Sequence, residues 1–171
     1  MKRMVLAWAA FASCAAAEEP ARAPDAVRQL EGCWQGTGSV LDKPVTIALE
    51  VRPVALGAMM AVDARSVATS DPADRYAAHL LFGGGKDAGQ VTGFWSDSFG
   101  GSMTATGLGS ARADGFEIAY RYSDAMFVNR WRIAGEELGW TILARDVQGK
   151  EQPFATYALR RVSCPQGPIA N

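Results

Sequence analysis

Apolar and polar residues alternate along several stretches of this chain. In residues 45–52, valine, isoleucine and leucine hold the odd positions, while threonine, glutamate and arginine hold most of the even ones. Residues 116–123 and 138–142 repeat the pattern. A period of two sends alternate side chains to opposite faces, which is typical of a strand with one buried face. These stretches therefore predict half-buried β-strands.

Turn-forming residues separate the alternating stretches at regular intervals. We expect about ten strands, over residues 33–41, 44–53, 58–69, 75–83, 89–97, 102–109, 115–123, 126–134, 138–147 and 152–162. The runs between them are rich in glycine, aspartate and proline. Short strands joined by such turns favour an antiparallel up-and-down meander, closed as a barrel or folded as a sandwich. The expected fold class is all-β.

Helical signals are confined to the start of the chain. One short helix is expected over residues 23–30, with Pro24 in its first turn. No later stretch has the length and period of a helix, which argues against parallel βαβ folds. Residues 70–74, Ser-Asp-Pro-Ala-Asp, are expected to form a surface loop. Because no linker composition interrupts the pattern, residues 18–171 are expected to form a single domain.

The first residues have the pattern of a secretory signal peptide. Lys2 and Arg3 precede an apolar run over residues 4–11, and small residues follow up to Ala17. A charged start, a short apolar core and an A-x-A exit are the parts of such a signal. We therefore expect a signal peptide over residues 1–17 and a periplasmic or secreted protein. Residues 11–14 also resemble a lipoprotein signal, so a lipid anchor at Cys14 is the alternative.

Cys33 and Cys164 remain after removal of that signal and lie near the two ends of the chain. In an oxidising compartment they can form a disulfide. A Cys33–Cys164 bond would bring the first strand beside the last, which indicates a closed or nearly closed barrel.

Charge and hydropathy exclude two kinds of partner. The 171 residues carry a formal net charge of −1, whereas nucleic-acid binding needs a concentrated basic surface. No segment after the signal is long and apolar enough to be a transmembrane helix.

Residues 32–38, Gly-Cys-Trp-Gln-Gly-Thr-Gly, form the most distinctive local motif. Trp34, Gly36 and Gly38 share one face of the predicted strand. A large indole followed by two glycines suits the closed end of a barrel, where the strand bends and approaches its neighbour closely.

This start resembles that of the calycin-like barrels, which include lipocalins, fatty-acid-binding proteins and nitrobindin-type haem barrels. Residues 93–98 and 105–107 are similar to motifs of a bacterial family, the domain of unknown function fifteen-seventy-nine. The ending Ala-Leu-Arg-Arg also suits both groups, and in lipocalins a late arginine packs on the early tryptophan. The resemblance gives that closing role to Arg160, spans residues 27–162 and implies a calycin-like up-and-down barrel.

Haem binding does not transfer directly with this resemblance. Nitrobindin-type barrels ligate haem through a histidine near the C-terminus, whereas the one histidine here is His79, in the middle of the chain. Haem ligation by His79 is an alternative to a structural role for it, and we otherwise expect no cofactor. One histidine and a cysteine pair are too few ligands for a tetrahedral zinc site, so no metal site is expected.

Aromatic and polar residues on the predicted inner faces suggest a ligand cavity. Strand parity directs the following candidates towards it: His79, Trp95, Asp97, Asn129 and Trp131. Such sites are mainly apolar with a few fixed polar groups. Asp63 and Asp97 lie among apolar residues, so each could be a buried acid or base, or could be outward-facing or bonded to arginine. Arg130 and Arg132 are candidate partners.

No catalytic motif is present in the sequence. It has no G-x-S-x-G elbow, and residues 83–86 lack the spacing of a phosphate-binding loop. We therefore expect non-enzymatic binding of a small apolar or amphipathic ligand. Two alternatives stay open. One is an envelope structural or interaction protein with a filled barrel, and the other is a lipocalin-like enzyme that uses a cavity carboxylate.

Overall fold

The structure is a computed structural model that describes residues 21–122 and 125–165. The expected signal peptide and Cys14 lie outside the described residues. No helix in the described part of the chain is long and apolar enough to cross a membrane.

The described chain forms one short α-helix, two single-turn 3₁₀ helices and ten strands. These are α1 (Asp25–Arg28), β1 (Gly32–Val40), β2 (Lys43–Val54), η1 (Ala55–Gly57), β3 (Met59–Ala68), β4 (Asp71–Gly84), β5 (Gln90–Asp97), η2 (Gly101–Met103), β6 (Ala105–Arg112), β7 (Gly115–Arg121), β8 (Met126–Ala134), β9 (Glu137–Arg145) and β10 (Glu151–Val162).

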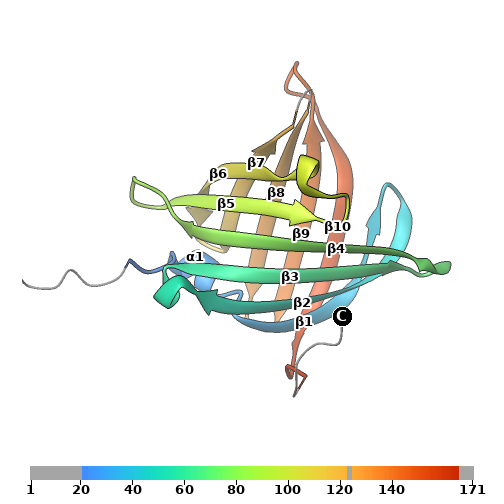
Figure 1. The fold of residues 1–171 in the computed structure, drawn as a ribbon, viewed down its shortest axis with the longest axis horizontal. Coiled ribbons are helices and arrows are strands. Elements are labelled where there is room, and N and C mark those ends of the chain that lie inside the picture. The colour runs from blue at the N-terminus through green and yellow to red at the C-terminus, as the bar shows by residue number, and fades with distance from the viewer. Residues whose placement is uncertain (1–20, 123–124, 166–171) are drawn as a thin grey trace, which may run out of the picture.

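Each strand pairs antiparallel with the next one along the chain, and β1 pairs with β10. The sheet therefore closes into a ten-stranded up-and-down barrel (Figure 1). This confirms the all-β fold class and the closure that the cysteine positions indicated. It also excludes the open sandwich.

Two local expectations differ from the structure. The helix is shorter than expected, because only Asp25–Arg28 are helical and Pro24 is its N-cap. Residues 71–74 begin β4 instead of forming a loop, although all of residues 70–74 are exposed. The β3–β4 pairing changes register here, from Val67 opposite Arg75 to Ala68 opposite Asp71. This irregularity lets a proline and two aspartates remain at a strand end.

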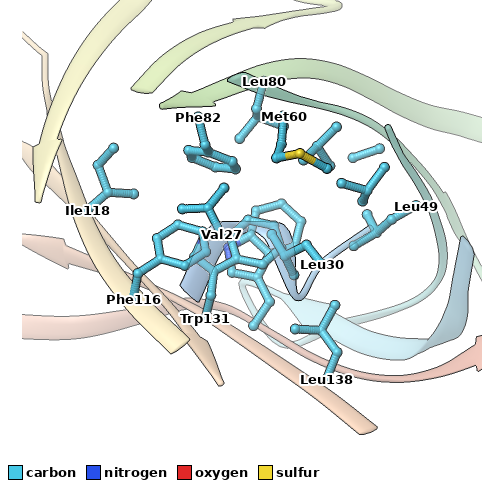
Figure 2. Packing of buried hydrophobic residues seen from close by; sticks show 14 of the residues in the cluster. Val27, Leu30, Leu49, Met60, Leu80, Phe82, Phe116, Ile118, Trp131 and Leu138 are labelled. Carbon is cyan, nitrogen blue, oxygen red and sulfur yellow. The ribbon is translucent and has the colours of Figure 1, made fainter. Parts of the chain in front are cut away.

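The barrel interior is filled by large rings in contact with one another. The Trp131 ring stacks on Trp140 at a centroid distance of 4.2 Å and on Phe116 at 5.7 Å. The Trp140 ring in turn lies 4.9 Å from that of Tyr157. From one end of the barrel, Val27 and Leu30 project among these side chains (Figure 2). Because both are fully buried, the helical segment acts as an apolar plug for that end.

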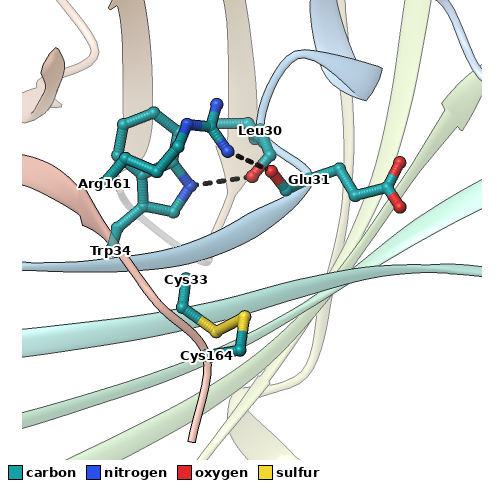
Figure 3. Close-up of a disulfide and its surroundings, with 6 residues drawn as sticks. All are labelled: Leu30, Glu31, Cys33, Trp34, Arg161 and Cys164. Atoms are coloured by element: carbon teal, nitrogen blue, oxygen red, sulfur yellow. Dashed lines mark hydrogen bonds between the residues drawn. A yellow bond between two sulfur atoms is a disulfide. The ribbon is translucent and has the colours of Figure 1, made fainter. Parts of the chain in front are cut away.

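Trp34 and Arg161 complete the closed end beside the plug. The Trp34 side chain is buried, and its Nε1 donates to the Leu30 carbonyl at 2.8 Å. The Arg161 guanidinium lies 4.1 Å from the Trp34 ring centroid and donates to the Glu31 carbonyl (Figure 3). It also donates to the Gln29 carbonyl at 3.1 Å. These contacts tie the plug to both the first and the last strand.

The assignment of this role to Arg160 was wrong by one residue. Alternation along β10 turns Leu159 inward and Arg160 outward, and the Arg160 side chain is 80% exposed and pairs with Glu137. Arg161 follows on the inner face. The two glycines of the early motif lie as expected, where β10 approaches β1. A Cβ on Gly36 would lie 2.0 Å from the Ala158 carbonyl oxygen, and one on Gly38 would lie 2.2 Å from that of Thr156.

A disulfide joins Cys33 to Cys164 at this same end. Cys33 pairs with Val162 in the β1–β10 ladder, so the bond continues that ladder just past its last residues (Figure 3). The structure therefore places the two ends of the meander side by side, as the sequence predicted.

Candidate binding site at the open end of the barrel

The end of the barrel opposite α1 has no helical plug among the described residues. Since α1 precedes β1 and successive strands are antiparallel, the β1–β2, β3–β4, β5–β6, β7–β8 and β9–β10 connections all lie at that end. We call it the mouth, and define it by these inward-facing or rim side chains: Tyr76, Asp97, Phe99, Tyr122, Phe127 and Phe154. Several connections at this end also expose apolar side chains, namely Leu41, Phe99, Met103 and Val147.

Asp97 is the polar centre of the mouth. It ends β5 on the same strand face as the buried Trp95. One carboxylate oxygen, Oδ2, accepts from the Tyr76 hydroxyl and from Trp95 Nε1, each at 3.0 Å. The other, Oδ1, accepts from the Phe99 backbone N–H at 2.9 Å. All three donors are neutral, and Asp97 makes no ion pair with any described residue.

Aromatic rings surround this carboxylate and extend across the mouth. The Tyr76 ring lies 5.6 Å from that of Phe99. On the strands after β6, the Phe127 ring makes edge contacts with Tyr122 at 5.5 Å and with Phe154 at 5.0 Å. Apart from Phe99, these rings are only partly buried, so the mouth presents aromatic surface to solvent.

The phenols near Asp97 are held in their neutral form. Burial, the charge of Asp97 and the hydrogen bond to it raise the pKa of Tyr76 far above its ordinary value. Burial, and then the charge of Asp97, also raise the pKa of Tyr122. Both side chains therefore stay protonated at neutral pH and can act as hydrogen-bond donors.

Below the mouth the barrel is packed. Trp95 forms the boundary, with its ring 5.5 Å from Tyr120 and 6.0 Å from Trp140. A hollow of about 230 Å³ lies at the rim between the β1–β2 turn and the start of β10. It is lined by Ser39, Leu41, Asp42, Pro153, Phe154, Ala155 and Thr156. Another, of about 110 Å³, lies at the Cys33 end. Any molecule bound at the mouth must therefore be held near the surface.

The structure brings only two of the five predicted cavity residues together at the mouth, Trp95 and Asp97. Asn129 and Trp131 face inward as expected but lie in the packed interior. There the Asn129 Oδ1 accepts from Trp140 Nε1 at 2.9 Å, which satisfies both groups within the core.

His79 does not face the interior, so its assignment to the cavity was wrong. Its neighbours Ala78 and Leu80 are buried inside, which turns His79 to the outer face of β4. There its Nδ1 lies 2.7 Å from Asp63 Oδ1, opposite it on β3. A haem inside the barrel could not be ligated from this position, so the residues present do not fit that alternative.

The remaining charged candidates also lie on the outer surface. Asp63 is bonded to His79 and lies 3.7 Å from the Arg52 guanidinium, so it is not an interior acid. Arg130 pairs with Glu117 at 2.7 Å and with Glu151 at 3.1 Å. Arg132 pairs with Asp114 at 3.0 Å. The two arginines are thus paired, but with neither of the aspartates considered from the sequence.

Sequence reasoning did not single out Tyr76, Phe99 or Phe154 as site residues. Tyr76 meets Asp97 only because the β4–β5 register sets Ala78 opposite Asp97. Phe99 is positioned by the β5–β6 connection, and Phe154 by a bulge in β10 between Pro153 and Ala155. No period or motif in a single chain indicates these three positions.

The fold and the mouth define a closed ten-stranded antiparallel β-barrel, plugged at one end and aromatic at the other. No protein-family model matches the chain, and no curated protein matches it. Among solved structures it is similar to the crystal structure of Rv2717c from M. tuberculosis, with a TM-score of 0.63 and 17% sequence identity. That match covers 82% of this chain and 99% of the other. It supports the barrel fold, while the resemblance to a particular family stays a prediction.

Proposed function

We propose that this barrel binds a small amphipathic molecule at its mouth, without converting it chemically. The observation that carries the proposal is Asp97, a carboxylate fixed by three neutral donors and surrounded by partly exposed aromatic rings. An apolar surface with one or two fixed polar groups is the usual composition of a small-molecule site.

The two parts of such a ligand have separate contacts. Its apolar part would lie against Tyr122, Phe127 and Phe154, whose rings already pack edge to face. Its polar end would meet Asp97 and the Tyr76 hydroxyl. Because the rings of Trp95, Trp140 and Trp131 fill the space below, the ligand would lie across the mouth instead of entering the barrel.

An exported location fits this proposal. The Cys33–Cys164 disulfide is compatible with an oxidising compartment, and the sequence predicts a signal peptide over residues 1–17. A lipid anchor at Cys14 stays the alternative processing route.

The second candidate is an envelope structural or interaction protein that acts through its outer surface. The continuous contact of Phe116, Trp131, Trp140 and Tyr157 favours it, since a filled interior needs no ligand for its stability.

Native mass spectrometry on protein purified from its own envelope, with an absorption spectrum, distinguishes the two candidates. A reproducible additional mass that is lost on denaturation supports the binding protein. Titration with decanol, followed by tryptophan fluorescence, then locates the site. We expect Phe127→Ala to weaken decanol binding about tenfold, the effect of losing part of one buried ring.

Phe94→Ala is the matched control, because Phe94 lies on the outer face of β5 and is 37% exposed. It should leave decanol binding unchanged. A bare polypeptide mass together with no saturable decanol binding would reject the binding proposal and favour the surface-acting barrel. Equal loss in both variants would place the decanol site away from the mouth.

A further inference from the structure

Asp97 differs from most of the acidic residues whose contacts are described. Asp71 and Asp146 also accept only from backbone N–H groups, but both are exposed, whereas Asp97 is partly buried on an inward strand face. The carboxylates of Asp25, Asp63, Asp74, Asp114, Glu117, Glu136, Glu137 and Glu151 each lie within ion-pair distance of a basic side chain. Asp97 has no such partner among the described residues and is bonded only to neutral donors. Its negative charge is therefore left uncompensated at the mouth.

The inner face of the described barrel supplies no unpaired cation to compensate it. Besides Asp97, the charged side chains at inward-facing strand positions are Arg161 and the pair Lys43 and Asp74. Lys43 and Asp74 lie at exposed strand starts and pair with each other at 2.6 Å. Arg161 lies at the opposite, closed end, over the Trp34 ring and against two carbonyls of the plug. Among the described residues, the Asp97 carboxylate is therefore the inward-facing charge at the mouth that no basic side chain neutralises.

The rings around Asp97 add to its preference for positive charge. Tyr76 and Trp95 both donate to its carboxylate, and Tyr122 is near enough for that charge to raise the pKa of its phenol. The faces of such rings carry negative electrostatic potential and attract ammonium groups, including quaternary ones. A ligand carboxylate would instead meet the repulsion of Asp97, and a neutral hydroxyl would gain nothing from its charge.

We propose that the mouth selects an organic cation, namely an alkylammonium or quaternary ammonium group on an apolar chain. Asp97 supplies the countercharge, Tyr76 and Trp95 hold that carboxylate in place, and the rings of Tyr122 and Phe127 contact the alkyl groups. This inference rests on the proposed function, because it names the chemical class of the molecule bound at the same site.

Three probes of equal chain length test the inference: octyltrimethylammonium, octanol and octanoate. Their affinities for the full mature protein are measured by calorimetry at low ionic strength. We expect octyltrimethylammonium to bind about tenfold more tightly than octanol, and octanoate most weakly. Added salt should weaken binding of the cation and leave octanol binding unchanged, because only the cation binds through charge.

Variants assign the preference to Asp97. Asp97→Asn should weaken octyltrimethylammonium binding about tenfold while leaving octanol within about twofold. Asp63→Asn is the matched control, since it removes an equal charge from the outer face. The wild-type salt dependence provides the test if Asp97→Asn does not fold.

The outcomes separate this inference from the proposed function. Octanol and octyltrimethylammonium binding with equal affinity and equal salt dependence would overturn selection for a cation and leave a binding site at the mouth. Equal effects of Asp97→Asn and Asp63→Asn would also overturn it. No saturable binding of any probe would reject the proposed function itself.

Discussion

Breaking the Cys33–Cys164 disulfide should destabilise the barrel by as much as about 5 kcal/mol. The bond joins residues separated by 131 positions, so it closes nearly the whole described chain into one loop. In the folded protein the same ends are already adjacent, because Cys33 pairs with Val162 in the ladder. The bond therefore adds little to the native contacts, and its effect comes from restricting the unfolded chain, whose entropy rises once the loop opens.

Urea unfolding and thermal unfolding, each followed by tryptophan fluorescence, measure this effect as a free energy and as a melting temperature. The wild type is compared with and without reductant, beside the double variant Cys33→Ala and Cys164→Ala. The melting temperature of a domain of this size falls by a few degrees for each kcal/mol of lost stability. The reduced wild type and the double variant should therefore each melt roughly 10–20 °C below the oxidised wild type. Reduction keeps the buried sulfur of Cys33, so it separates the loss of the bond from any loss of packing. Coincident unfolding curves for oxidised and reduced wild type would refute the reasoning.

Three further predictions concern the closed end and the tyrosines. Gly36→Ala should lower the free energy of unfolding by about 1–3 kcal/mol, because the added methyl group overpacks against β10. The control Gly139→Ala, whose Cβ would lie 3.9 Å from that of Arg132, should change it by less than about 0.5 kcal/mol. Equal urea midpoints for the two variants would disprove the close approach of β10 to Gly36. Arg161→Gln should lower the free energy of unfolding by about 2 kcal/mol, because it loses the ring contact and the hydrogen bonds to two plug carbonyls. Arg160→Gln should leave it almost unchanged. The reverse order of the two variants would argue against closure by Arg161. Burial raises the pKa of Tyr157 to about 12 and raises that of the other three tyrosines. The folded state then keeps phenolic protons that the unfolded state releases, so the free energy of unfolding should fall as pH rises above about 10. Phenolate absorbance that appears at about pH 10 in the native protein would contradict the raised pKa values.

The strands could be predicted closely because their side chains obey a simple period. All ten expected ranges correspond to strands of the structure, with boundaries a few residues apart. Trp34, Gly36 and Gly38 could also be placed on one inner face, since residues two apart on a strand share a face. For the same reason Trp95 and Asp97 could be assigned together.

One error occurred where a period alone does not give the direction. In β4 the apolar run around His79 has apolar residues at both even and odd positions, so the sequence leaves open which set faces inward. The structure turns Leu80 in and His79 out. At the end of β10 two arginines follow each other, and the closing role was given to Arg160 by the family resemblance. The alternation of Tyr157 and Leu159 on the inner face instead continues to Arg161, which lies over Trp34.

By itself the sequence determined an all-β meander, its turns and the two cysteines that can join its ends, because these follow from neighbouring residues and from composition. Tertiary structure alone decided the mouth. Tyr76 and Asp97 are 21 residues apart along the chain, and the register between β4 and β5 brings their side chains into contact. Whether the interior was hollow also depended on how rings from seven different strands pack, since the space inside a barrel is divided among all the strands that enclose it.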